Sequence, residues 1–535
     1  MARLTALALA LILALFAATP SFGSGQTYWP GRNLDWERRR PEELGLDAAK
    51  IRQAVEIAVA GESDSPRDLA FNHQMTFGRE PHGEPIGPFT VRGPQSGVIV
   101  YRGYIVAEWG EPHKVDNTFS VAKSFLSTTV GLAYDRGHIT DVHDPVRPYV
   151  APIVLEDGDG EPGDERGRRP KLLFESEHNR KITWDHLLRQ TSDWEGTLWG
   201  KPEWADRPDR TPSTWGTRAR VGPGTVFEYN DTRVNLLALA ATNVWRQPLP
   251  EVLREYVMDP IGASPTWRWH GYDNSWITLD GRPVQSVSGG SHWGGGLLIN
   301  AFDMARFGLL TLHKGVWNGQ RIISEEWLGM ATTPTDVQPG YGFMNFYLNT
   351  ESRRYAQAPE YTWTHSGAGS NLIYVDPAND LVIVSRWIQG GAFTDVVHTV
   401  LEAKGAIATT ASVASTRNQL ESQPDSSEVN LDVPSFTPFT VRPVLLNADE
   451  VERTLIREYP AELADAGVSG APILWLHIGT DGTMLSTRVV ESSGFAALDA
   501  AAANIANAMR FTPAYNRDRA VAVWIQMPIR FAAVN

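Results

Sequence analysis

The sequence predicts an α/β (α+β) protein with one antiparallel sheet, flanking helices and an inserted helical subdomain, followed by a small separate α+β unit. Two hairpins predict the sheet. β-Branched and aromatic runs flank Arg102-Gly103 over residues 97–109, and a second pair of runs turns at residues 376–380. Between these hairpins the patterns are mainly helical. Strands from both ends of the unit are therefore expected to share one sheet.

The length and composition set the first limits on function. A chain of 535 residues is too long for one compact domain, and 42% hydrophobic residues with 19 tryptophans indicate folded material. The formal net charge of -14 argues against a nucleic-acid partner and against a polybasic membrane surface. The chain has no cysteine, which excludes disulfides, a cysteine nucleophile and thiolate zinc sites.

The N-terminus has the pattern of a secretory signal peptide. Arg3 precedes an apolar run over residues 4–18, and small or helix-breaking residues follow up to Gly25. We expect a signal peptide over residues 1–23 and export to the periplasm or cell envelope. The alternative is an uncleaved anchor, although the run is short for a bilayer span of about 20 residues.

Composition divides the remainder into three parts. Residues 28–405 carry the predicted sheet and its helices, residues 408–439 form a Ser-, Thr- and Pro-rich linker, and residues 440–535 form the small unit. In the first part, helices are expected over residues 48–60, 120–136, 234–241, 302–312 and 393–407, with a further helix that begins after Thr183. In the small unit we expect helices over residues 448–457 and 498–509, and strands over residues 473–478, 484–491 and 522–531.

The expected helix over residues 120–136 carries the main chemical signal. Ser120 and Lys123 stand three residues apart and therefore lie on one face of it, one turn apart. A serine hydroxyl needs a base to remove its proton, and a lysine serves once burial or neighbouring charge lowers its pKa. This is the S-x-x-K arrangement of serine acyl-transferring enzymes. Alone it is a weak signal, because a capping serine and an exposed lysine give the same four letters.

Two other segments invite a metal interpretation that we do not favour. Residues 138–145 hold two histidines and two aspartates, but they form a turn after a helix and no third cluster completes a ligand set. Residues 155–171 are acidic, but Pro162 stands where a calcium loop needs glycine. We expect a solvated insertion there, and neither a metal nor a cofactor is implied.

Three motifs in one order strengthen the chemical interpretation: Ser120-Val121-Ala122-Lys123, Tyr229-Asn230-Asp231 and His365-Ser366-Gly367-Ala368. Together they resemble the class C β-lactamase and penicillin-binding-protein-like serine hydrolases, a group that includes D-alanyl-D-alanine peptidases, family VIII esterases and 6-aminohexanoate-dimer hydrolases. The resemblance covers roughly residues 28–405 and implies the β-lactamase/transpeptidase-like fold.

The resemblance also implies a role for each motif. Ser120 would be the nucleophile that forms an acyl-enzyme, Lys123 would be its base or would tune it, and Tyr229 would pass the proton to the leaving group. The backbone N–H groups of Ser120 and Ala368 would form the oxyanion hole. His365 would replace the lysine of the K-T-G motif and help to hold an anionic or polar end of the substrate.

The substrate side of the expected site departs from the family in two ways. Ser366 and Gly367 continue the third motif, but His365 stands where lysine is usual. The Y-x-N motif ends in Asp231, so a carboxylate replaces a neutral amide donor that would contact the acylamino carbonyl of a penicillin. We therefore expect an esterase, amidase or peptidase with weak or no β-lactamase activity.

The small unit resembles the C-terminal domain of TonB-type energy transducers. The residues that carry the resemblance include Glu458-Tyr459-Pro460-Ala461, Asp481-Gly482 and Met509-Arg510-Phe511-Thr512-Pro513-Ala514. That family pairs an edge strand with a segment of an outer-membrane protein, so the resemblance implies an outer-membrane or envelope protein as partner.

These observations lead to one functional prediction with two alternatives. We expect an exported serine hydrolase that acts on a small-molecule or peptide-like substrate and carries a C-terminal protein-binding domain. The first alternative is a non-catalytic penicillin-binding-like sensor or scaffold. The second is a TonB-type energy transducer, which would require the N-terminal segment to stay uncleaved.

Overall fold

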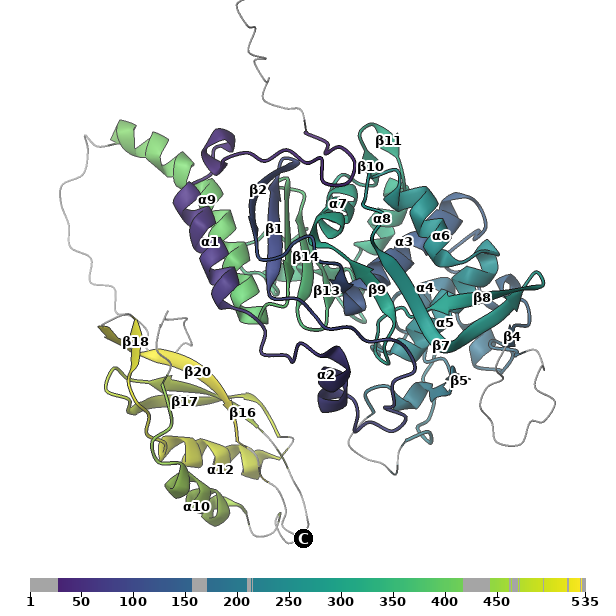
Figure 1. The fold of residues 1–535 in the computed structure, drawn as a ribbon. Helices are drawn as coiled ribbons and strands as arrows, with labels where there is room; N and C mark the ends of the chain where they lie inside the picture. The colour runs from purple at the N-terminus through teal and green to yellow at the C-terminus, as the bar shows by residue number, and fades with distance from the viewer. Residues whose placement is uncertain are drawn as a thin grey trace, which may run out of the picture. The chain divides into compact units, whose positions relative to one another are not determined.

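The structure is a computed structural model that describes residues 27–155, 171–208, 213, 215–416, 443–460, 463, 470, 472–493, 495–516, 519–529 and 531. The chain divides into two compact units, Met1–Asn418 and Gln419–Asn535 (Figure 1), each considered by itself. The predicted signal peptide lies outside the described residues, as do the acidic segment 156–170 and the linker beyond residue 416.

A six-stranded antiparallel sheet forms the centre of the first unit. Its strand order is β12 (Tyr347–Leu348), β13 (Trp363–Gly367), β14 (Asn371–Asp376), β15 (Leu381–Arg386), β1 (Ser96–Tyr101) and β2 (Tyr104–Trp109). Strands β1 and β15 pair from Ser96↔Arg386 to Tyr101↔Leu381. This pairing joins the two predicted hairpins, which confirms that both ends of the unit share one sheet.

Helices cover both faces of this sheet. Val98 and Val100 belong to one hydrophobic cluster, whereas Ile99 and Tyr101 belong to another, as the period of two in a strand requires. Helices α1 (Ala48–Ala60) and α9 (Gly390–Thr416) pack on the second face, and α7 (Ala301–Leu312) packs on the first (Figure 1).

Helix α9 is longer than the sequence predicted. It continues from the expected end at Ile407 to Thr416, through residues that were expected to begin the linker. Residues 408–416 contain no glycine or proline, so nothing in them breaks a helix that has already formed.

The inserted region is built on two buried helices. Helix α3 (Ala122–Asp135) is buried at every position from Ala122 to Ala133, and it packs against α5 (Asp231–Trp245). A helix that is buried on all sides must lie within a core. The other helices of this unit are α2 (Leu69–Thr76), α4 (Trp184–Leu188), α6 (Leu249–Leu253) and α8 (Glu325–Ala331).

A second sheet borders the helical region. It has the order β3 (Asp116–Asn117), β9 (Gly296–Ile299), β7 (Arg268–Leu279) and β4 (Val154–Leu155), and β8 (Arg282–Val287) also pairs with β7. The β7–β8 hairpin was not predicted. Short strand pairs complete the unit: β5 (Thr197–Leu198) with β6 (Lys201–Pro202), and β10 (Val316–Trp317) with β11 (Gln320–Arg321).

The second unit has the α+β arrangement that the sequence predicted. Strands β17 (Met484–Glu491), β16 (Ile473–Ile478) and β20 (Val523–Pro528) form an antiparallel sheet in that order. Helices α10 (Ala448–Glu458) and α12 (Ala496–Asn507) accompany it, with a short pair β18 (Ala514–Asn516) and β19 (Arg519–Val521). In both units, the part of the chain that the structure describes contains no helix long and apolar enough to cross a membrane.

Candidate active site

Ser120 and Lys123 meet at the start of α3. Ser120 lies in a short 3-10 turn, Phe119–Val121, that leads into the helix, and the Lys123 Nζ donates to the Ser120 Oγ over 2.9 Å. Lys123 is fully buried and Ser120 is 9% exposed. The helical spacing in the sequence therefore predicted this contact correctly, and a reacting carbonyl can approach only the serine.

The residue before the serine holds an unfavourable backbone angle. Phe119 has φ of +49°, which costs a non-glycine residue about 1 kcal/mol or more. The side chain of Asn117 stabilises this turn, because its Oδ1 accepts from the Phe119 N–H over 2.6 Å and its Nδ2 donates to the Gly295 carbonyl over 2.9 Å. The turn fixes the direction in which Ser120 points.

Strand β13 passes directly beside this turn. A Cβ on Gly367 would lie 2.0 Å from the Thr118 carbonyl oxygen and 3.1 Å from the Ser120 nitrogen, so only glycine fits there. Ser366 is half-buried and its carbonyl accepts from Asn345, whereas Ala368 is exposed at the end of the strand. The structure thus brings the third motif next to Ser120, as expected.

His365 has a different environment from the one expected. Its side chain is fully buried among Phe307 and Phe346, and its Nδ1 lies 2.8 Å from the Oγ of Ser124, one helical turn after Ser120. Burial lowers the pKa of His365 to about 3, so the ring is neutral. A buried, neutral ring beneath Ser120 does not favour the predicted role of His365 in holding an anionic or polar substrate end, and that role stays a prediction.

Asp231 forms a buried ion pair with Lys123. It occupies the first turn of α5, where the helix dipole favours a negative charge, and its Oδ1 contacts the Lys123 Nζ. Its Oδ2 accepts from Arg207 over 3.2 Å. Burial would raise the pKa of Asp231, but Lys123 and Arg207 outweigh it and lower that pKa. Both carboxylate oxygens of Asp231 therefore contact cations within the protein, Lys123 and Arg207.

The charge of Lys123 depends on two opposing effects. Burial lowers the pKa of Lys123, and the Asp231 carboxylate opposes this by attraction and by a hydrogen bond. The net shift is downward, which makes the amine easier to deprotonate than an exposed lysine. The geometry and the direction of the shift both suit a base for Ser120.

Tyr229 stands over the lysine as a neutral phenol. The Lys123 Nζ lies 4.7 Å from the centre of the Tyr229 ring. Burial raises the pKa of Tyr229 well above its ordinary value, and the nearby Tyr347, Asp231 and Tyr341 add to the effect. Tyr229 shares a hydrogen bond with Tyr347. It can therefore donate or relay a proton but does not start as a phenolate.

The charged network continues away from the serine. Asp206 accepts from the backbone N–H of Asp231 and from Arg207, and His292 lies on its other side. The His292 Nε2 is 2.9 Å from Glu80 Oε2, while its Nδ1 lies 3.6 Å from Asp206 Oδ1 and 3.7 Å from Asp231 Oδ2. Burial raises the pKa of Asp206, against the opposing charges of Arg207 and His292.

Glu80, Asp206 and His292 are close enough together to be considered as metal ligands. Their arrangement does not fit one ion, because Glu80 and Asp206 face opposite nitrogens of the same imidazole ring. The guanidinium of Arg207 also already neutralises Asp206. A dication at this position would lie beside that cation, so we assign no metal here.

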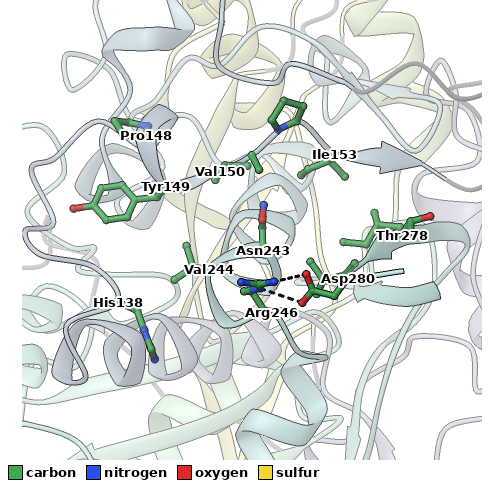
Figure 2. Close-up of a pocket in the computed structure, with 14 residues that line it drawn as sticks. His138, Pro148, Tyr149, Val150, Ile153, Asn243, Val244, Arg246, Thr278 and Asp280 are labelled. Carbon is green, nitrogen blue, oxygen red and sulfur yellow. Dashed lines mark hydrogen bonds and ion pairs between the residues drawn. The ribbon is translucent and has the colours of Figure 1, made fainter. Parts of the chain in front are cut away.

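A separate cavity lies at the far end of the same helices. It has a volume of about 560 Å³, and its lining includes His138, Tyr149 and an ion pair between Arg246 and Asp280 (Figure 2). His138 follows the C-terminal end of α3 and Arg246 follows that of α5, whereas Ser120 and Asp231 stand at the opposite ends. Helices of 14 and 15 residues are about 21 Å long, so this cavity is not part of the serine site.

Comparison with known proteins identifies both parts of the chain. Residues 96–385, more than half of the chain, match the family described as Beta-lactamase. Residues 457–533 match the Gram-negative bacterial TonB protein C-terminal. A Paenarthrobacter ureafaciens protein named 6-aminohexanoate-dimer hydrolase is 26% identical over 279 residues, which are 50% of this chain. The match covers 65% of that relative, slightly less than two thirds of its length.

Solved structures with a similar fold include two relevant examples. One is a penicillin-binding protein homolog from Caulobacter crescentus, with 14% identity and a TM-score of 0.40, covering 67% of this chain and 99% of the other. Another is a putative 6-aminohexanoate-dimer hydrolase from Bacillus anthracis, with 16% identity and a TM-score of 0.37, covering 61% and 83% of the two chains.

Proposed function

The chain belongs to the beta-lactamase family, and from this premise we propose that it is a serine hydrolase that acts through an acyl-enzyme on Ser120. The observation that carries the proposal is the buried contact between Lys123 and Ser120. A buried amine with a lowered pKa, placed on a hydroxyl that remains accessible, is the arrangement that activates a serine.

The proposed reaction has one proton path. Ser120 attacks the carbonyl carbon while Lys123, in its neutral form, takes the hydroxyl proton. Tyr229 relays a proton to the leaving group, and the N–H groups of Ser120 and Ala368 stabilise the oxyanion. Water then hydrolyses the acyl-enzyme and releases Ser120.

The proposed substrate is an ester, amide or peptide rather than a β-lactam. Asp231 offers no N–H to an acylamino carbonyl, and both its oxygens are engaged by Lys123 and Arg207. The name of the Paenarthrobacter ureafaciens relative supports an amide substrate. We propose further that the protein is exported to the periplasm, and that the C-terminal unit binds an envelope protein, on the basis of its match to the TonB C-terminal family.

Mass spectrometry of the intact protein tests the catalytic part. Wild type and Ser120→Ala would be incubated separately with a fluorophosphonate and with a penicillin. A fluorophosphonate adduct on wild type alone supports an activated Ser120, and a lasting penicillin adduct would point to peptidoglycan-type substrates. No adduct with either reagent would overturn the hydrolase proposal and favour a non-catalytic sensor. N-terminal sequencing of the mature protein tests export, because an intact Met1 would contradict cleavage.

A further inference from the structure

The outer edge of β13 is the part of the candidate site that a substrate chain would follow. Strand β14 pairs with one edge of β13 along its whole length, and β12 pairs with the other edge at Trp363 and Thr364. Backbone groups of successive residues point to opposite edges of a strand. The Thr362 carbonyl accepts from the residue that follows β12, so the backbone groups of Ser366 and Ala368 point to that side as well. Beyond Thr364, these two residues form the edge that carries the proposed oxyanion donor.

Both carbonyl oxygens on this edge accept hydrogen bonds from buried asparagine side chains. The Asn345 Nδ2 donates to the Ser366 carbonyl over 2.7 Å, and the Asn371 Nδ2 donates to the Ala368 carbonyl over 2.9 Å. Both asparagines are fully buried. The second bond lies within the turn that ends β13, where Gly369 has a positive φ, whereas the first lies beside the strand itself. A peptide that paired with this edge would need these two carbonyls as acceptors for its own N–H groups.

Asn345 is fixed beside Ser366 by the turn in which it stands. Met344 and Asn345 have φ of +22° and +68°, in the left-handed region that a methionine disfavours. The Met344 N–H donates to the Leu188 carbonyl over 2.7 Å, and the Asn345 N–H donates to the Tyr341 hydroxyl over 2.7 Å. Among the described residues, the buried Oδ1 of Asn345 has no hydrogen-bond partner. An unfavourable backbone and an unpaired buried oxygen at one place point to a functional constraint on this side chain.

The position of Tyr229 gives the direction in which a substrate would lie along this edge. The centre of its ring lies 6.4 Å from that of Tyr341, and it shares a hydrogen bond with Tyr347 on β12. Tyr229 therefore lies toward the Ser366 end of the open edge. Because Tyr229 is the proposed proton donor to the leaving group, the leaving group lies at that end and the acyl group at the Ala368 end. A substrate peptide would then run antiparallel to β13.

We propose that Asn345 determines which leaving groups the enzyme accepts: by capping the Ser366 carbonyl, it excludes a leaving group that pairs with β13 as a peptide would, and it selects a simple alcohol or amine. This inference rests on the proposed function of Ser120. In an antiparallel peptide, the second residue after the scissile bond would direct its N–H at the Ser366 carbonyl. The Asn345 amide occupies that place on the edge. The peptide N–H would lose its water and gain no acceptor, which is costly.

Two esters that differ in one group test this selection in the full-length protein. The first is the butanoyl ester of glycolic acid N-methylamide, which carries an N–H at the position that would meet the Ser366 carbonyl. The second is the butanoyl ester of 1-hydroxybutan-2-one, in which CH2 replaces that N–H. The kcat/KM of each would be measured for the wild type, Asn345→Gly and Asn349→Gly. Glycine accepts the positive φ at position 345 and removes the amide. Asn349 is a matched control, because it is fully buried and its amide donates to the carbonyls of Tyr355 and Ala358.

The measured quantity is the ratio of kcat/KM for the amide ester to kcat/KM for the ketone ester. In the wild type this ratio should be one or less, because the N–H finds no acceptor. Asn345→Gly should raise it about tenfold, because the freed Ser366 carbonyl accepts from the N–H. Asn349→Gly should lower stability but keep the ratio within about twofold of the wild type. A ratio compares two substrates on one protein, so a loss of folded protein cancels. An unchanged ratio in Asn345→Gly would overturn the inference.

The wild type decides the question if Asn345→Gly does not fold, because a clear preference for the amide ester would overturn the inference without any variant. Fluorophosphonate labelling separates this failure from a failure of the proposed function. A wild type that is labelled at Ser120 but cleaves neither ester would overturn the selection of simple leaving groups while the hydrolase proposal stands. Absence of both labelling and cleavage would overturn the proposed function, and with it the role assigned to Asn345.

Discussion

Replacing Asp231 with asparagine would exchange a carboxylate for an amide of nearly the same size where Lys123 and Arg207 meet. The substitution restores the Y-x-N sequence of the second motif, so it tests the departure that sets this site apart. In the wild type, the Asp231 carboxylate contacts Lys123 and accepts from Arg207. The variant keeps the shape of the site and removes the negative charge.

The size of the effect on Lys123 follows from Coulomb's law. Two unit charges 4 Å apart at an effective dielectric of about 20 attract by about 4 kcal/mol, and Asp231 and Lys123 are closer than that. Without this attraction, burial acts unopposed by Asp231 and the pKa of Lys123 falls further. We expect the pH of half-maximal fluorophosphonate labelling to fall by about two units or more.

The same substitution should destabilise the fold in a pH-dependent way. The pKa of Lys123 is lower in the folded protein than in the unfolded chain, so the unfolded chain binds more protons and stability rises with pH between the two values. In Asp231→Asn this window extends to lower pH. The loss of stability should therefore be small near pH 9 and grow to about 3 kcal/mol near pH 6, as for a broken buried ion pair.

Asp303→Asn provides a control for a buried aspartate away from the nucleophile. Asp303 is 1% exposed and accepts hydrogen bonds from Ser264 and Asn300. The Asp303→Asn substitution should lower the free energy of unfolding in urea titrations without moving the pH profile of labelling. If Asp231→Asn left the labelling profile in place, or shifted it upward, Asp231 would not control the charge of Lys123 and the electrostatic account of the site would be refuted.

Three further variants test individual contacts. Tyr229→Phe should keep fluorophosphonate labelling within severalfold but slow amide hydrolysis about 100-fold, because only the leaving group needs the phenol proton; an equal loss in both assays would contradict this. Since the pKa of His365 is about 3 in the fold, the neutral ring costs stability as pH falls from about 6.5 toward 3, by about 1.4 kcal/mol per unit. His365→Gln should remove that slope from urea titrations, and an unaltered slope would show that the ring is protonated in the fold. In Gly367→Ala the new Cβ would overlap the Thr118 carbonyl oxygen, so fluorophosphonate labelling should slow at least tenfold. A normal labelling rate would show that β13 can shift away from the Ser120 turn without disturbing the serine.

The sequence was sufficient for the parts of the site that depend on local spacing. Ser120 and Lys123 are one helical turn apart in any helix, and the hairpins at Arg102-Gly103 and at residues 376–380 have local turn signals. The β7–β8 hairpin was missed although its turn, Asp280-Gly281, is a favoured dipeptide and both residues have positive φ. Its strands deviate from simple alternation around Gly271, where the register shifts.

The rest of the site depends on contacts between distant segments. Glu80, Arg207 and His292 come from three loops, and nothing in their own neighbourhoods indicates that they converge on Asp231. Their residue types are visible in the sequence, but only the folded chain brings these three residues together around Asp231 and Asp206. The sequence therefore predicted the contact between Ser120 and Lys123 and missed most of the charged groups that surround Lys123.

His365 matches the third motif by position, but its surroundings differ from those that the motif implies. Its strand alternates, so His365 and Gly367 point to the same side, toward α3. Gly367 meets the turn at Ser120, and one strand step away His365 reaches Ser124, one helical turn deeper. Two residues along the strand span nearly the same distance as one turn of the helix, so the His365 ring lies beneath Ser120. A short neutral ring in that position fills the core, whereas a longer lysine side chain could extend to the substrate.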